Sequence, residues 1–264
     1  MNIINSFLAS KYFESISPFL AKKIFKIFKI FFVKTKYDTL PDHNYIIKKD
    51  ETIKRFEEGK NFQDRDLKPY ITYSHLLDLI TVMNKKEIFN FFDYGAGNLD
   101  LFFYLKKKIP NINYFFYDLQ EVMDLLTNFI IKENLKNIEI SSKINNNFYD
   151  LVYFGSSLQY LKDYKKEILK FKNNTKYILI SQTPFFNDTN YYKENLVIKQ
   201  VNMHPSINYL YMINFDKFLK FMNDNNFELI DKNLNRVTKF LNFKNLKKDF
   251  VNIDMYDLLF INKK

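Results

Sequence analysis

From Glu87 onward, short apolar runs alternate with amphipathic segments, and no other feature of the sequence restricts the fold as strongly. The apolar runs predict strands at 88–94, 114–117, 138–140, 150–154 and 177–181. Amphipathic helices are predicted between them, at 98–108, 120–133 and 164–171. Because helices join consecutive strands, we expect a parallel sheet with helices on both faces and a ligand site at the carboxyl ends of its strands.

The C-terminal part of the chain departs from this pattern. A helix predicted at 214–225 is followed by strands at 227–232 and 256–262, and residues 239–248 predict only a short helical turn between them. The last two strands are therefore expected to pair as an antiparallel unit. The sequence as a whole predicts a Rossmann-like, doubly wound α/β fold with a mostly parallel, seven-stranded sheet and an antiparallel C-terminal strand.

The segment 1–35 is basic and amphipathic. From Ser17 it reads SPFLAKKIFKIFKIFFVK, with lysines on one helical stripe and apolar residues over most of the remaining surface. A membrane-spanning helix needs about 20 largely apolar residues, whereas the longest apolar run here is 30–33. We therefore expect a helix at 17–34 that either lies in a membrane interface or docks on its own domain.

Residues 36–84 are predicted to be a helical lead-in to a main domain at 85–264. Gly59 is interpreted as a break between two polar helical stretches, and Pro69 as the start of a helix over about residues 70–83.

The stretch 91–100 reads FFDYGAGNLD and holds two of the four glycines of the chain. Glycine is used where the backbone must adopt a positive φ or approach another group closely. The acidic residue Asp118 closes the next predicted strand, about 20 residues after Gly97, where nucleotide-binding sheets place an acid that accepts the ribose hydroxyls. Asp118 and Glu121 also match a D-x-x-E capping box for the following helix.

Three further stretches accompany this turn: LVYFGSSLQYL at 151–161, YILISQTPFF at 177–186 and VNMHPSINYLYMINFDKFL at 201–219. Together with FFDYGAGNLD, the acid closing the second strand and the closing strand pair, they resemble a class I S-adenosylmethionine-dependent methyltransferase. More specifically, the chain is similar over about residues 65–235 to a family of predicted bacterial methyltransferases often found among surface-polysaccharide genes.

The resemblance implies an enzyme that uses S-adenosyl-L-methionine as its cofactor. The implied cofactor-binding residues are Asp93, Gly95, Ala96, Gly97, Asn98, Asp118, Gly155 and Ser156. Asp93 is expected to meet the amino group of the cofactor or to orient the turn. The family usually has another glycine at the position of Leu99, so the Leu99 side chain must point away from the cofactor or narrow its site.

The implied methyl acceptor is a hydroxyl of a sugar in a surface glycan or its precursor. The residues assigned to the acceptor are Ser157, Gln159, Tyr160, Thr183 and Tyr209, although the two serines at 156–157 fit a turn cap equally well. We expect residues 201–212 to form an acceptor-site loop. His204 within it is the candidate general base, because a sulfonium donor is already activated and the acceptor has only to lose a proton.

Charge and composition bear on other functional classes. The formal net charge of +10 invites a nucleic-acid interpretation, but only three of the basic residues are Arg, so we expect a small-molecule or glycan acceptor. The chain lacks cysteine and shows no metal-ligand spacing, so no metal is expected and a cytoplasmic location is predicted, with peripheral membrane contact through residues 17–34. A non-catalytic binding module and an RNA methyltransferase remain the alternatives.

Overall fold

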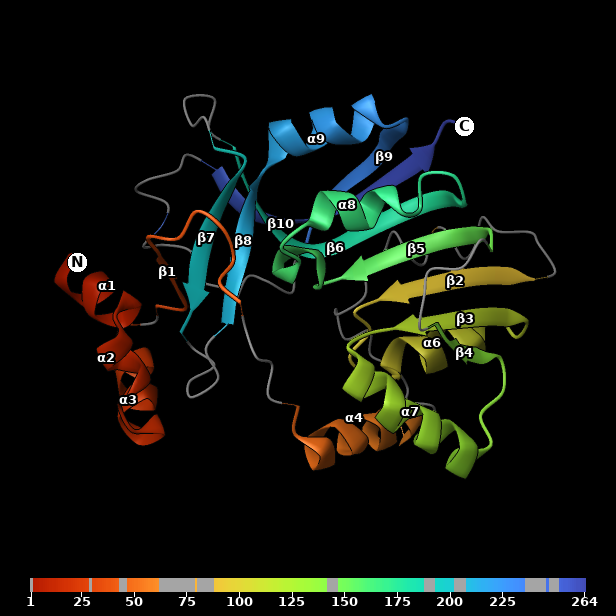
Figure 1. The fold of residues 1–264 in the computed structure, drawn as a ribbon, viewed down its shortest axis with the longest axis horizontal. Coiled ribbons are helices and arrows are strands. Elements are labelled where there is room, and N and C mark those ends of the chain that lie inside the picture. Colours follow the sequence, from red (N-terminus) through yellow and green to blue (C-terminus); the bar gives the residue numbers. More distant parts are fainter. Residues whose placement is uncertain are drawn as a thin grey trace.

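The computed structural model describes residues 2–28, 30–42, 47–61, 79, 88–141, 147–187, 193–201, 208–235, 246 and 252–264. These residues contain one ten-stranded sheet, flanked by helices (Figure 1). The predicted Rossmann-like, doubly wound α/β fold is confirmed, including its antiparallel C-terminal strand.

The seven strands predicted from the sequence form a continuous part of this sheet. In spatial order they are β4 (Ile138–Ile140), β3 (Ile112–Tyr117), β2 (Phe89–Tyr94), β5 (Tyr149–Gly155), β6 (Thr175–Asn187), β10 (Asn252–Asn262) and β9 (Phe227–Leu234). The first five are parallel to one another, and β10 is antiparallel to both β6 and β9. The carboxyl ends of β2, β3 and β5 therefore meet at one edge of the sheet.

The helices that connect these strands lie close to their predicted positions. They are α6 (Asp100–Lys108), α7 (Gln120–Glu133), α8 (Tyr164–Leu169) and α9 (Phe215–Asp224). A short 3-10 helix that was not predicted, η1 (Leu158–Tyr160), precedes α8. Neighbouring side chains of β2 supply the core on both faces of the sheet, because side chains alternate along a strand. Phe91 packs with residues of α6 and α7, whereas Phe92 packs with residues of α8 and α9.

Three strands that the sequence did not reveal extend the sheet beyond β6. They are β8 (Asn208–Asn214), β7 (Asn195–Gln200) and β1 (Phe32–Lys34). The end of β6 pairs with β8 in parallel, and β7 and β1 follow in antiparallel pairing. The prediction that residues 201–212 form a loop is therefore wrong from Asn208 onward, while His204 lies outside the described residues.

The expected helix at 17–34 is also shorter than predicted. It runs from Pro18 to Phe28 as α3, after α1 (Asn2–Ala9) and α2 (Lys11–Glu14). The apolar residues at 32–33 are buried in β1, because pairing with β7 and burial in the sheet outweigh the helical pattern of the sequence. No helix in the described ranges combines the length and the apolar character that crossing a membrane requires.

Gly59 was interpreted as a break, but it lies inside helix α4 (Lys49–Asn61). A Cβ atom on Gly59 would lie 2.8 Å from Oδ1 of Asp100 and 3.2 Å from the carbonyl carbon of Leu99. Glycine therefore lets α4 approach the first residues of α6, and this close approach supports the segment that follows the glycine turn. Of the helix predicted at 70–83, with Pro69, the structure describes only Leu79, and of residues 239–248 it describes only Leu246.

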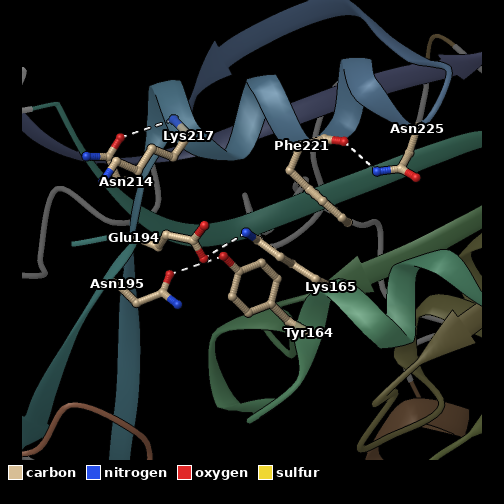
Figure 2. A network of polar contacts seen from close by, with 8 residues as sticks. All are labelled: Tyr164, Lys165, Glu194, Asn195, Asn214, Lys217, Phe221 and Asn225. Atoms are coloured by element: carbon tan, nitrogen blue, oxygen red, sulfur yellow. Dashed lines mark hydrogen bonds and ion pairs between the residues drawn. The ribbon is translucent and has the colours of Figure 1, made fainter. Parts of the chain in front are cut away.

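Polar contacts tie the added strands to the predicted part of the fold, as Figure 2 shows. The Tyr164 hydroxyl of α8 donates a hydrogen bond to Oδ1 of Asn195 on β7, at 3.1 Å. Beside it, the Lys165 ammonium lies 2.7 Å from the Glu194 carboxylate. Asn214 ends β8 and caps α9, because its side chain accepts a hydrogen bond from the backbone N–H of Lys217.

Candidate cofactor site

The glycine turn follows β2 at the carboxyl edge of the sheet. Gly95 and Gly97 have φ values of 72° and 66°, in the left-handed region where glycine avoids the steric cost of a side chain. The N–H groups of Gly95 and Ala96 donate to the carbonyl of Tyr117 at 2.8 and 3.4 Å, which fastens the turn to the end of β3. A Cβ atom on Gly97 would meet nothing within 4 Å, so the turn has open space over Gly97.

Asp118 faces this turn. One carboxylate oxygen accepts a hydrogen bond from the backbone N–H of Gly97 at 2.7 Å, and the other accepts one from Leu119 at 2.7 Å. Burial raises the pKa of Asp118, and these two N–H donors oppose the rise. Each carboxylate oxygen keeps acceptor capacity, because an ionised carboxylate offers about four lone-pair positions.

The capping box considered for Asp118 and Glu121 does not form. The N-cap residue of α7 is Leu119, and no side chain caps the helix there. Asp118 points instead to the turn after the neighbouring strand, and this orientation favours the ligand-binding role over the capping role.

Leu99 lies in the hydrophobic core and not over the turn. Its side chain is fully buried among residues of α4, α6 and α7. Its φ of −107° is accessible to any residue, so no glycine is required at this position. Asn98, just before it, accepts a hydrogen bond from the backbone N–H of Asp100 at 3.0 Å and so helps to order the start of α6.

Asp93 is buried beneath the turn, where the Tyr114 hydroxyl of β3 donates a hydrogen bond to it. Burial raises the pKa of Asp93 to about 7, the hydrogen bond from Tyr114 lowers it, and the nearby Asp118 raises it. The arrangement supports the expectation that Asp93 orients the turn. Tyr114 was not predicted, because only the parallel register of β2 and β3 places it beside Asp93.

The raised pKa of Asp93 predicts a pH-dependent stability. Between the ordinary pKa of 3.8 and about 7, the folded protein keeps a proton on Asp93 that the unfolded chain has lost. Stability therefore falls as pH rises through this window, by up to about 1.4 kcal/mol per pH unit, and levels off above it. Asp93→Asn should remove this contribution. The difference in free energy of unfolding between the original protein and the variant, measured by urea titration, should therefore change by about 2 kcal/mol between about pH 5.5 and pH 7. Parallel pH profiles for the two proteins would contradict the assignment.

The end of β5 lies against the glycine turn. The Ser157 hydroxyl donates a hydrogen bond to the carbonyl of Tyr94 at 2.7 Å. A Cβ atom on Gly95 would lie only 2.6 Å from Cβ of Ser157, so the two backbones approach closely here. Gly155 ends β5, and Ser156 follows it with a φ of 58°. Ser157 thus holds the two strand ends together, while a contact with substrate stays a prediction.

Gln159 forms hydrogen bonds with several polar groups beside the end of β5. Its amide nitrogen donates to Oγ and to the carbonyl oxygen of Ser156, both at 3.1 Å, and to the carbonyl of Gln182 at 3.3 Å. Its amide oxygen accepts a hydrogen bond from the Thr183 hydroxyl at 3.2 Å. The structure therefore brings Ser156, which was assigned to the cofactor, together with Gln159 and Thr183, which were assigned to the acceptor.

A bulge in β6 positions Thr183. Residues 181 and 182 of β6 lie opposite the single residue Asp257 of β10, and Gln182 has a φ of 54°. The buried carboxylate of Asp257 accepts hydrogen bonds from the Ser181 hydroxyl at 2.6 Å, the Gln182 N–H at 3.1 Å and the Asn235 amide at 2.9 Å. Asp257 was not predicted, since an acidic residue within an apolar strand is its only signal in the sequence.

Tyr160 and Tyr209 lie apart from each other. The Tyr160 hydroxyl is 3.4 Å from Oε1 of Gln200. The Tyr160 side chain packs on the face of β7 and β8 that carries Leu210. Tyr209 lies on the opposite face, with its ring 5.5 Å from that of Tyr37. Tyr209 packs instead against the core cluster that contains Leu158 of η1, and His204 lies outside the described residues.

Comparison with known proteins supports the fold. No protein-family model and no curated protein matches the sequence. The 1,6-didemethyltoxoflavin-N1-methyltransferase of Burkholderia thailandensis, solved with 1,6-didemethyltoxoflavin and S-adenosylhomocysteine, matches with a TM-score of 0.50 and 9% identity, over 85% of this chain and 94% of that one. An S-adenosylmethionine-dependent methyltransferase from Clostridium acetobutylicum matches with a TM-score of 0.46 and 13% identity, over 81% and 99% of the two chains. The chain thus has the fold of class I methyltransferases.

Proposed function

We propose that this protein is a methyltransferase that uses S-adenosyl-L-methionine. The observation that carries the proposal is the glycine turn: Gly97 has a left-handed backbone, open space where a side chain would lie, and an N–H group bonded to Asp118. The turn lies at the carboxyl ends of parallel strands, where sheets of this type bind nucleotides.

The residues present fit this cofactor. The backbone of residues 95–98 would lie against its methionine and ribose parts, and the free acceptor capacity of Asp118 suits the ribose hydroxyls. Asp93 would act through the turn, because its carboxylate is buried and hydrogen-bonded to Tyr114. S-Adenosylmethionine supplies, when bound, a methyl group already activated as a sulfonium. The chain itself has to orient the acceptor and remove one proton.

We propose a sugar hydroxyl, in a surface glycan or its precursor, as the methyl acceptor. Ser156, Gln159 and Thr183 form a neutral polar group beside the end of β5, in which Ser156 is partly exposed while Gln159 and Thr183 are buried behind it. Neutral surroundings suit a polyhydroxyl compound better than a charged one. The sequence after β5 is Gly-Ser-Ser-Leu, without the Asn-Pro-Pro-Tyr-like stretch expected for methylation of an exocyclic base nitrogen. His204 is the proposed base that takes the hydroxyl proton.

Calorimetric titration with S-adenosylmethionine and S-adenosylhomocysteine tests the proposal. The full chain should be used, because removing the first 35 residues would delete strand β1. We expect micromolar binding by the unmodified protein, and Asp118→Ala should weaken it about 100-fold by removing the ribose acceptor and releasing the Gly97 N–H. Gly97→Leu should abolish binding, because its side chain would enter the open space over the turn.

Asp124→Ala is the matched control, since Asp124 is an exposed acid on α7, the helix that follows Asp118, and accepts a hydrogen bond from the Gln120 amide. It should leave binding unchanged. If the unmodified protein binds neither compound, the chain is a non-catalytic module with this fold, and the methyltransferase proposal fails. If binding occurs, methyl transfer to nucleotide sugars and glycans should be assayed against transfer to RNA.

A further inference from the structure

Helices α1–α3 expose an unusual amount of apolar surface. Seven of the sixteen large hydrophobic side chains that are exposed in the described part of the chain lie in the first 28 residues. They are Ile3, Phe7, Tyr12, Phe19, Leu20, Ile27 and Phe28. Phe19 and Ile27 are 68% and 71% exposed, so most of each side chain lies outside the core. Exposed apolar side chains concentrated in one segment indicate an interaction site.

The same helices are docked on the protein by their other face. Leu8, Phe13 and Ala21 are buried with Val33 of β1 and with Val201, which follows β7. The Lys199 ammonium of β7 donates a hydrogen bond to the carbonyl of Ser10 at 3.3 Å. Docking on the domain and contact with a further surface are therefore compatible, because they use opposite faces of the helices.

The outer face is cationic as well as apolar. Residues 1–35 contain six lysines and a single acid, Glu14. On α3, Lys22, Lys23 and Lys26 alternate with Phe19 and Ile27 at spacings of three and four residues, which places them on one side of a helix. None of these three lysines forms an ion pair with a described residue, and the Lys23 ammonium lies 4.5 Å from the centre of the Phe19 ring.

We propose that the outer face of α1–α3 docks on a membrane surface that contains anionic phospholipids. A short helix with apolar side chains beside lysines is typical of a segment that lies in a membrane interface. The apolar side chains enter the boundary of the acyl chains, and the lysines contact the anionic headgroups. An RNA partner would use the lysines but would give the exposed aliphatic side chains no apolar surroundings. Figure 1 shows α1–α3 beyond the edge strand β1, at the opposite end of the sheet from β4, so this face projects from the body of the fold.

Sedimentation of the full chain with lipid vesicles tests the proposal. We expect strong binding to vesicles of phosphatidylcholine mixed with phosphatidylglycerol, and weak binding to phosphatidylcholine alone. The double variant Phe19→Ser, Ile27→Ser should weaken binding to the anionic vesicles by about tenfold or more, through loss of the inserted side chains. The triple variant of Lys22, Lys23 and Lys26 to Glu should weaken it at least as much, through loss of attraction to the headgroups.

Matched controls change similar side chains elsewhere. Ile131 and Ile230 are 74% and 47% exposed, and their replacement by Ser should leave vesicle binding within about twofold of the original. A triple change of Lys107, Lys132 and Lys166 to Glu reverses the same number of charges on other helices. Circular dichroism and melting curves should show every variant folded, since each altered side chain is exposed.

Several results would overturn the proposal. One is absence of binding to the anionic vesicles, and another is binding that the two α3 variants and the controls reduce equally. Self-association that Phe19→Ser, Ile27→Ser abolishes, without vesicle binding, would make the face an interface between copies of the chain. RNA binding that depends on the lysines but not on Phe19 and Ile27, again without vesicle binding, would assign the face to nucleic acid.

Discussion

Asp257→Ala is expected to lower the free energy of unfolding by about 4 kcal/mol, because it leaves several buried donors without an acceptor. The Asp257 carboxylate accepts hydrogen bonds from Ser181, Gln182 and Asn235, and its side chain is only 3% exposed. Alanine would also leave a cavity where β6 bulges. Urea-induced unfolding followed by circular dichroism measures the loss.

Two variants on the same strand control this experiment. Asp254→Ala removes an acid that is only half-buried on β10, and it should cost less than about 1 kcal/mol. Asp257→Asn keeps one acceptor oxygen at the bulge and should therefore recover part of the lost stability. If Asp257→Ala is no less stable than Asp254→Ala, the carboxylate does not hold the bulge.

The bulge matters for function because of what it separates along β6. Before it, β6 pairs with β5, at whose end Gly155 and Ser156 lie. After it, Phe185 and Phe186 pair with β8 of the added strands. Bulges bend a strand and redirect its side chains. The proposed acceptor residue Thr183 thus occupies the point where the predicted sheet meets the part that the sequence did not reveal.

Local patterns in the sequence predicted most of the shared fold. The bounds of α7 follow directly from apolar spacing, and the antiparallel pairing of β9 with β10 follows from the lack of a crossover helix between them. The glycine turn was identified because a chain with four glycines places two of them directly after a strand. Each of these signals lies within a few residues of the element that it predicts.

The remaining features depend on contacts between distant segments. β1 is a strand because it pairs with β7, more than 160 residues away, as the hydrogen bond between Thr35 and Val197 illustrates. Its own sequence has a helical pattern. The contact of Tyr114 with Asp93 and the approach of Gly59 to Leu99 likewise require the register of β2 and β3 and the packing of α4 on α6. No local pattern contains this information.

Gly95→Ala is expected to lower the free energy of unfolding by about 3 kcal/mol, and Gly97→Ala by only about 1 kcal/mol. Both substitutions place a side chain on a residue with a left-handed backbone. Only at Gly95 does the new Cβ atom collide, at 2.6 Å, with Cβ of Ser157, which its hydrogen bond to Tyr94 holds in place. Urea titration of the two variants measures the difference.

A double-mutant cycle identifies the cause of the larger loss. Ser157→Gly removes the atom that collides, so Gly95→Ala should cost about 2 kcal/mol less in the Ser157→Gly background than in the original protein. Equal costs in the two backgrounds would show that strain in the backbone, and not the approach of β5 to the turn, disfavours a side chain at Gly95.

Gly97→Ala separates stability from ligand binding at the same turn. Its methyl group meets no protein atom within 4 Å, so the variant should remain folded at room temperature. We expect S-adenosylhomocysteine to bind it at least about tenfold more weakly in calorimetric titration, because the methyl group would lie where the proposed ligand approaches the backbone. A Gly97→Ala protein that binds like the original would place the ligand elsewhere. Weak binding by a stable variant would instead mean that the positive φ and the open space at Gly97 serve the ligand and not the fold.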